Sequence, residues 1–108
     1  MKAYLVVYLV ERTYTWEDDW GTDYSVLFTD RDEALTALKE QVGEEIADYK
    51  AEGINVHINP ERDIPDGDYV VEEFYTTNGD CSVLITKWGW GLSHHVDWTL
   101  KKLELEVK

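Results

Sequence analysis

The sequence has a single cysteine, Cys81, and only two prolines among its 108 residues. A lone cysteine cannot form a disulfide within the chain, which excludes a disulfide-stapled secreted scaffold and favours a reducing, cytoplasmic location. No apolar stretch approaches the ~20 residues of a membrane span, so we expect no membrane partner. Basic residues are also scarce: ten lysines and arginines face 23 aspartates and glutamates, and the net charge is −13.

The negative charge is concentrated in the middle of the chain. Residues 11–80 hold 20 acidic and five basic side chains, a net of −15, whereas residues 81–108 hold three acidic and four basic ones. Such a field repels nucleic acid and anionic membranes and attracts basic surfaces. We therefore expect a basic protein as the partner and no direct binding to nucleic acid. The competing interpretation is that the carboxylates serve only solubility.

Apolar material is sufficient for one core. Apolar residues make up 44% of the chain and include five tryptophans and seven tyrosines, and the length suits a single domain spanning residues 1–108. Residues 3–12 are apolar on both faces, which predicts a central strand covered on both sides. A polar loop at residues 13–22 and a second strand at residues 23–29 follow.

A long amphipathic helix is predicted to begin after Asp30. Asp30 and Glu33 have the spacing of a capping box, and Gly53 is a suitable stop. Apolar residues recur between them at three- and four-residue steps, the pattern of a helix with one buried face. This stripe consists of Leu35, Leu38, Val42, Ile46 and Tyr49.

The remainder of the chain is typical of strands. Residues 54–59 predict a short edge strand. Asn78-Gly79, between two alternating segments, is typical of a two-residue hairpin turn and would set Phe74 opposite Val83. Alternation resumes at residues 95–107.

The apolar alternation of that last segment changes parity at Lys101-Lys102, which suggests a bulge or a turn. The element order β-β-α-(β)-β-β-β then predicts an α+β fold. Its mainly antiparallel β-sheet would have five to six strands, with one long helix packed on one face.

Patterns for catalysis, metal binding or a bound cofactor are incomplete. Cys81 falls on a predicted core face, where a thiol is usually an inert small hydrophobe, and there is no glycine-rich phosphate loop. The nearest groups of metal ligands are His94, His95 and Asp97 on one strand and Asp63, Asp66 and Asp68 in one loop. The first lacks ligands for a closed site and the second lacks the EF-hand pattern. We predict a non-enzymatic protein with no metal and no cofactor.

Two sets of residues are candidates for contact with a partner. In the first, four carboxylates step by four along the helix, about 6 Å apart, and neighbouring acids add to their field; the alternative is an ordinary solvated helix face. The second is aromatic, because tryptophan is enriched among interface hot spots. The acidic set is Glu40, Glu44, Glu45, Asp48, Glu52, Glu17, Asp18 and Asp19, and the aromatic set is Trp16, Trp20, Trp88 and Trp90.

The alternative for the tryptophans is packing on the sheet face opposite the helix. We expect that packing for Trp88 and Trp98. For Trp16 and Trp20 both interpretations stay open.

In its size, its −15 segment and its helical row of Glu40, Glu44, Asp48 and Glu52, the chain resembles small acidic inhibitor proteins of phages and mobile elements, among them DNA mimics and anti-CRISPR proteins. The resemblance implies an inhibitor that blocks the basic surface of a nucleic-acid-binding enzyme. The alternative is a general protein-interaction or immunity-type domain of unknown partner, whose acidity serves solubility only. A small enzyme is the third hypothesis.

Overall fold

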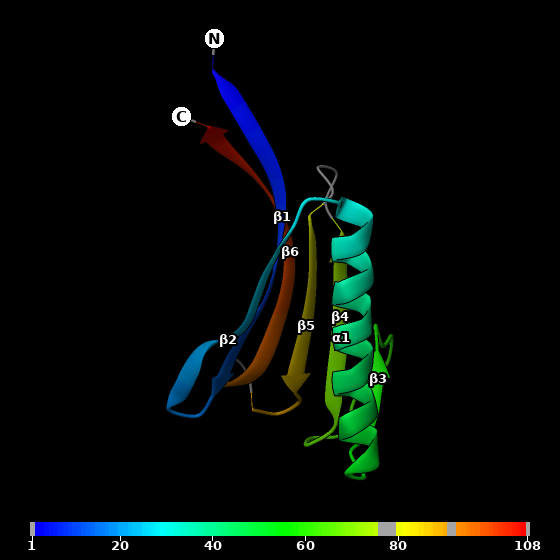
Figure 1. Ribbon diagram of the computed structural model, residues 1–108. Helices are drawn as coiled ribbons and strands as arrows, with labels where there is room; N and C mark the ends of the chain where they lie inside the picture. The colour runs from blue at the N-terminus through cyan, green and yellow to red at the C-terminus, as the bar shows by residue number, and fades with distance from the viewer. Residues whose placement is uncertain (1, 76–79, 91–92, 108) are drawn as a thin grey trace.

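The computed structural model describes residues 2–75, 80–90 and 93–107. Its elements are β1 Ala3–Trp16, β2 Asp19–Phe28, α1 Arg31–Ala51, β3 Val56–Ile58, β4 Tyr69–Tyr75, β5 Cys81–Lys87 and β6 His94–Val107. The strands form one sheet in the order β2-β1-β6-β5-β4-β3, and α1 lies across one of its faces (Figure 1). The prediction of an α+β fold with one helix on a sheet is confirmed. The sheet is mixed, however, because β3 runs parallel to β4 while the other pairs are antiparallel.

The helix follows the sequence prediction closely. Asp30 is the N-cap, and its carboxylate accepts a hydrogen bond from the backbone N–H of Asp32 at 2.8 Å. Gly53, just beyond the last turn, has φ +85°, the left-handed conformation that ends many helices. The apolar stripe faces the sheet: Leu38 and Val42 are buried, together with Ala34, and Leu35, Ile46 and Tyr49 pack against the same core.

The predicted polar loop at residues 13–22 is wrong. β1 continues to Trp16 and β2 begins at Asp19, so Glu17 and Asp18 form a two-residue turn. Glu17 has φ +57°, the left-handed conformation that such tight turns need. Tyr14 and Trp16 continue the alternation of β1, but the polar composition of the segment concealed this period of two.

A β-bulge interrupts the pairing of β1 with β2. Arg12 lies opposite Tyr24 and Thr13 lies opposite Thr22, so Asp23 has no residue opposite it. Bulges often redirect a side chain. Here the bulge brings the carboxylate of Asp23 within reach of Arg12.

The pairing of β4 with β5 is confirmed, but the predicted register is off by one residue. Phe74 lies opposite Ser82 rather than Val83. Val71, and not Val70, therefore shares the helix-facing core with Cys81. The observed register gathers Val71, Val83 and Ile85 in the core under α1, and burial of an apolar face is what specifies register. The Asn78-Gly79 turn lies outside the described residues.

The connection from β3 to β4 must reverse twice because the two strands are parallel. It contains Ile64, which is buried and lies with Val70 and Trp88 around a cavity of about 300 Å³ on the face opposite α1. Trp88 therefore packs on the sheet face predicted for it. Trp98 does not: it is buried in the core that α1 covers.

β6 is unbroken, so the bulge or turn expected at Lys101-Lys102 is wrong. It pairs with β1 in one register along its whole length. As far as Leu100 its apolar residues face α1, and beyond that point they lie on the opposite face. The parity change thus marks a change in which face is apolar, not a change in the backbone.

The expectation that the first strand is covered on both sides holds for only part of its length. The face of β1 that carries Val10 packs against the core under α1. On the other face Val7 is buried, but Leu5 is 48% exposed. The fold has two layers, and the single helix leaves this end of the sheet uncovered (Figure 1).

Candidate functional site

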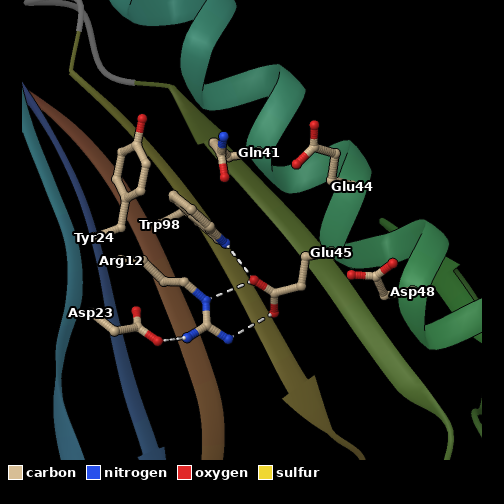
Figure 2. Close-up of a pocket in the computed structure, with 8 residues that line it drawn as sticks. All are labelled: Arg12, Asp23, Tyr24, Gln41, Glu44, Glu45, Asp48 and Trp98. Atoms are coloured by element: carbon tan, nitrogen blue, oxygen red, sulfur yellow. Dashed lines mark hydrogen bonds and ion pairs between the residues drawn. The ribbon is translucent and has the colours of Figure 1, made fainter.

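A polar cluster joins α1 to the sheet at the side of β1 and β2. It consists of Arg12, Asp23, Glu45, Tyr49 and Trp98. The guanidinium of Arg12 donates through Nε to Oε1 of Glu45 at 2.8 Å and through a second nitrogen to Oε2 at 3.2 Å. Its third nitrogen reaches Oδ2 of Asp23 at 2.6 Å. Figure 2 shows this arrangement, with Arg12 lying between the two carboxylates.

Two further donors complete the shell of Glu45. Trp98 Nε1 donates to Oε1 at 2.8 Å, and the hydroxyl of Tyr49 donates to Oε2. Both carboxylate oxygens are therefore occupied. A charge that is partly removed from water needs such partners, because an unpaired one would be costly.

Burial and these hydrogen bonds have opposite effects on the pKa values of Glu45 and Arg12. Burial by itself would raise the pKa of Glu45, but the hydrogen bonds from Arg12, Tyr49 and Trp98 outweigh it and lower that pKa. Burial likewise disfavours the charged form of Arg12, yet its bonds to Glu45 and Asp23 raise the pKa above its ordinary value. Burial and the bond to Glu45 both raise the pKa of Tyr49. All three groups keep their ordinary charge states near neutral pH.

The cluster lies in an open cavity of about 370 Å³, whose rim adds Gln41, Glu44 and Asp48. Its central groups are already bonded to one another, so no carboxylate oxygen of Glu45 is left to take a proton from a substrate. We interpret the cluster as a clamp that fixes the helix to the sheet. The carboxylates on the rim are what a partner would meet.

Those rim residues belong to the acidic helix row, defined as Glu40, Glu44, Asp48 and Glu52. All four side chains are exposed. Ion pairs among the described residues involve Lys2, Arg12, His57, His94 and Lys102, and none includes a member of the row. The row is therefore a line of exposed negative charges along α1 that form no ion pair among the described residues, and it borders the cavity at Glu44 and Asp48.

Glu45 and the hairpin acids do not join this row. Glu45 was placed on the acidic face from the sequence, but its side chain is 11% exposed and held by Arg12. Glu17, Asp18 and Asp19 are exposed at the tip of the β1–β2 hairpin, which lies away from α1 in Figure 1. The acidic set thus divides into the helix row and a separate hairpin tip.

All four tryptophans proposed for binding are exposed to some degree, and Trp20 is the most exposed at 73%. Trp16 and Trp90 nevertheless make internal contacts. The Nζ of Lys87 lies 4.1 Å from the centre of the Trp90 ring, and Trp16 packs edge-on against His94 at 4.6 Å. Trp20 makes no ring contact of this kind among the described residues, and as the most exposed of the four it is the aromatic side chain most available to a partner.

The residues considered as metal ligands are dispersed. His94 is buried beside Trp16 and Ser93, whereas Asp97 lies on the other face of β6 and accepts a hydrogen bond from Ser82. In the loop, Asp68 bonds to His57 at 3.0 Å. No cluster of three or more metal-binding side chains occurs within the described part of the chain.

The polar cluster was missed from the sequence. The available signal was Arg12, a lone base at an inward position of an apolar strand, in phase with Val10. A second signal was Glu45, which lies three residues after Val42 and four before Tyr49 on the buried side of the helix. Neither signal alone identifies the partner across 33 residues of sequence.

Comparison with protein-family models, with curated proteins and with solved structures finds no match to this chain. Within the described ranges, no helix combines the length and the apolar character that crossing a membrane requires.

Proposed function

We propose that the protein is a non-enzymatic inhibitor or adaptor that uses the acidic helix row to cover a basic surface of a partner protein. The partner would be a nucleic-acid-binding enzyme, whose lysine and arginine groove the row would occupy in place of phosphates. The observation that carries the proposal is the exposed row without an ion-pair partner among the described residues.

The helix provides a regular spacing for these charges. Residues four apart on a helix rise about 6 Å, whereas one DNA strand carries a charge about every 3.4 Å. The row alone is therefore sparser than a DNA strand. Asp23 lies at the same cavity beside Glu44 and Asp48, but its carboxylate is paired with Arg12 and adds no free charge to the row. The row would therefore suit a basic groove in which not every lysine and arginine needs a negative partner.

Keeping the row has a cost to the isolated protein. Like charges four residues apart destabilise a helix by about 0.2–0.5 kcal/mol per pair, and the row contains three such pairs in sequence. The alternative, an interaction domain whose acidity gives only solubility, requires no particular position for the charges. The two proposals therefore differ in whether position matters.

A pull-down from a host lysate tests this difference. The row variant, E40Q/E44Q/D48N/E52Q, removes four charges from the helix. The control variant, D18N/D19N/E61Q/D63N, removes four exposed charges from other places. We expect the row variant to lose the captured partner and the control to retain it.

Two further observations complete the test. Capture by the parent protein should weaken steeply as salt is raised, because exposed charges are screened beyond about 8–10 Å at physiological ionic strength, and duplex DNA should displace the partner. The loss in the row variant should appear mainly in the association rate. Equal loss in both variants would assign the effect to net charge, and retention by the row variant would refute the proposed surface.

A further inference from the structure

Among the described strands, one sheet edge carries none of the usual protection against pairing with another chain. β2 pairs with β1 only as far as Tyr8, which lies opposite Phe28. Residues 3–7 of β1 therefore pair with β6 on one side and with no described strand on the other. We call residues 3–7 the open β1 edge. Figure 1 shows it extending, together with the end of β6, beyond the other strands of the sheet. The molecule measures 56 × 28 × 24 Å.

The other free edges are protected in the ways that natural sheets use, which include charges, bulges, proline and short length. β2 has the bulge at Asp23. β3 is only three residues long and is followed within two residues by Pro60. The free part of β6 carries Glu104 and Glu106. The open β1 edge, by contrast, contains only alanine, tyrosine, leucine and valine.

An apolar surface accompanies this edge on the face opposite α1. Leu5 and its partner across the sheet, Leu105, are 48% and 44% exposed, and Leu27 and Val107 are 56% and 54% exposed. Side chains alternate between the two faces of a strand, so Glu104 and Glu106 lie on the other face. This end of the sheet therefore exposes apolar side chains with no carboxylate among them.

We propose that two copies of the protein join through their open β1 edges and form one continuous antiparallel sheet about a twofold axis. The register follows from the length of the edge. β2 closes the edge at Tyr8, so an antiparallel pairing that uses all five residues must be centred on Leu5. Leu5 then meets Leu5 of the second copy and Ala3 meets Val7, and the apolar surfaces of the two copies become continuous.

The charges on the two strands favour β1 over β6 as the strand that pairs between the two copies. Self-pairing of β6 centred on Leu105 would set Glu104 opposite Glu106 twice, and like charges directly opposite destabilise a strand pair. Pairing through β1 brings no charged residues opposite each other. Because the edge lies at one end of an elongated molecule, it also directs the acidic hairpin tips of the two copies away from each other (Figure 1). Their repulsion is then screened over more than a Debye length of about 8–10 Å.

The mass of the full chain in solution tests the proposal. Sedimentation equilibrium from micromolar to millimolar concentration should give twice the 12.6 kDa of one chain at the upper end. Leu5→Lys should raise the dimer dissociation constant about tenfold or more, because two lysines meet at the axis and the leucine contact is lost. Leu105→Lys is the matched control, since it places the same charge on the neighbouring strand of the same face and should leave the dimer largely intact.

Because Leu5 would lie opposite Leu5 of the second copy, variants of opposite charge can restore the dimer, and this rescue shows that neither variant is simply misfolded. Leu5→Lys and Leu5→Glu proteins should each dimerise at least about tenfold more weakly than the parent, and an equimolar mixture should form a heterodimer, because unlike charges then meet at the axis. A monomeric parent protein at millimolar concentration would overturn the proposal. So would equal disruption by Leu105→Lys, which would indicate stacking of two sheet faces, or the absence of a heterodimer from two folded variants. The row variant E40Q/E44Q/D48N/E52Q should dimerise like the parent, so failure of the proposed function would not affect this result.

Discussion

Replacing Arg12 by methionine should destabilise the fold by more than its position near the surface suggests. The substitution removes the three bonds from the guanidinium to Glu45 and Asp23 while leaving Glu45 packed against Trp98. Breaking a fully buried ion pair costs about 3–5 kcal/mol. The side chains of Arg12 and Glu45 are 20% and 11% exposed, so water relieves part of that penalty. We expect a loss of about 2–3 kcal/mol in the free energy of unfolding at pH 7.

The loss of stability in Arg12→Met should depend on pH in a definite direction. In the parent protein the pKa of Glu45 is lowered, so the stability it contributes is present above the ordinary glutamate value of about 4.3 and is lost as pH falls through the folded value. In Arg12→Met, Glu45 stays buried but loses the hydrogen bonds from Arg12, which contribute most to lowering its pKa. We therefore expect the pKa of Glu45 to be raised in this variant. The variant should then lose stability as pH rises from about 4.3 through that pKa. The difference between the two proteins should be largest near neutrality and should shrink toward pH 4.

Urea denaturation followed by circular dichroism measures these free energies. A double-mutant cycle with Glu45→Met and the double variant isolates the pair, and we expect a coupling of about 1–3 kcal/mol. The double variant should be more stable than Arg12→Met, because it removes the charge left unpaired. Additive effects within about 0.5 kcal/mol, or a difference that does not change with pH, would refute the assignment of the cluster as a clamp.

Other substitutions should act through backbone conformation and burial. Gly43→Ala should raise the melting temperature by about 4–8 °C, since an alanine in a helix interior gains about 1 kcal/mol and its methyl group would meet no atom within 4 Å. Gly89→Ala should lower it, because φ is +89° and the new Cβ would lie 2.7 Å from Cγ of Asp66; thermal melts of both variants beside the parent decide. Cys81 is buried and its burial raises the pKa of the thiol, so a colorimetric thiol reagent at pH 7 should react with it only after urea unfolds the chain. Rapid reaction of the folded protein would show that the thiol is accessible.

Local features of the fold could be predicted from the sequence because they depend on residues close together in the chain. The cap at Asp30, the stop at Gly53 and the apolar stripe through Leu38 and Val42 each occupy one or a few turns of helix. The edge position of residues 54–59 and the hairpin partnership of β4 with β5 likewise follow from short patterns and turn residues.

The sequence also determined the acidic helix row, since residues four apart share a side of any helix. It could not determine that Glu45 leaves that surface. The position of Glu45 on the helix is compatible with either side of the boundary, and Arg12, 33 residues away in the chain, decides it. The contribution of Asp23 depends in the same way on a bulge that only the pairing of two strands creates.

Register and coverage were decided by the tertiary structure alone. Phe74 lies opposite Ser82 because the sheet, with a helix on one face only, buries the side chains that the helix can cover. The parity change near Lys101 has the same origin: the segment continues as a strand, but α1 does not extend over it. A periodic sequence specifies which residues share a face. Which of the two faces is covered, and by what, depends on the placement of an element that lies elsewhere in the chain.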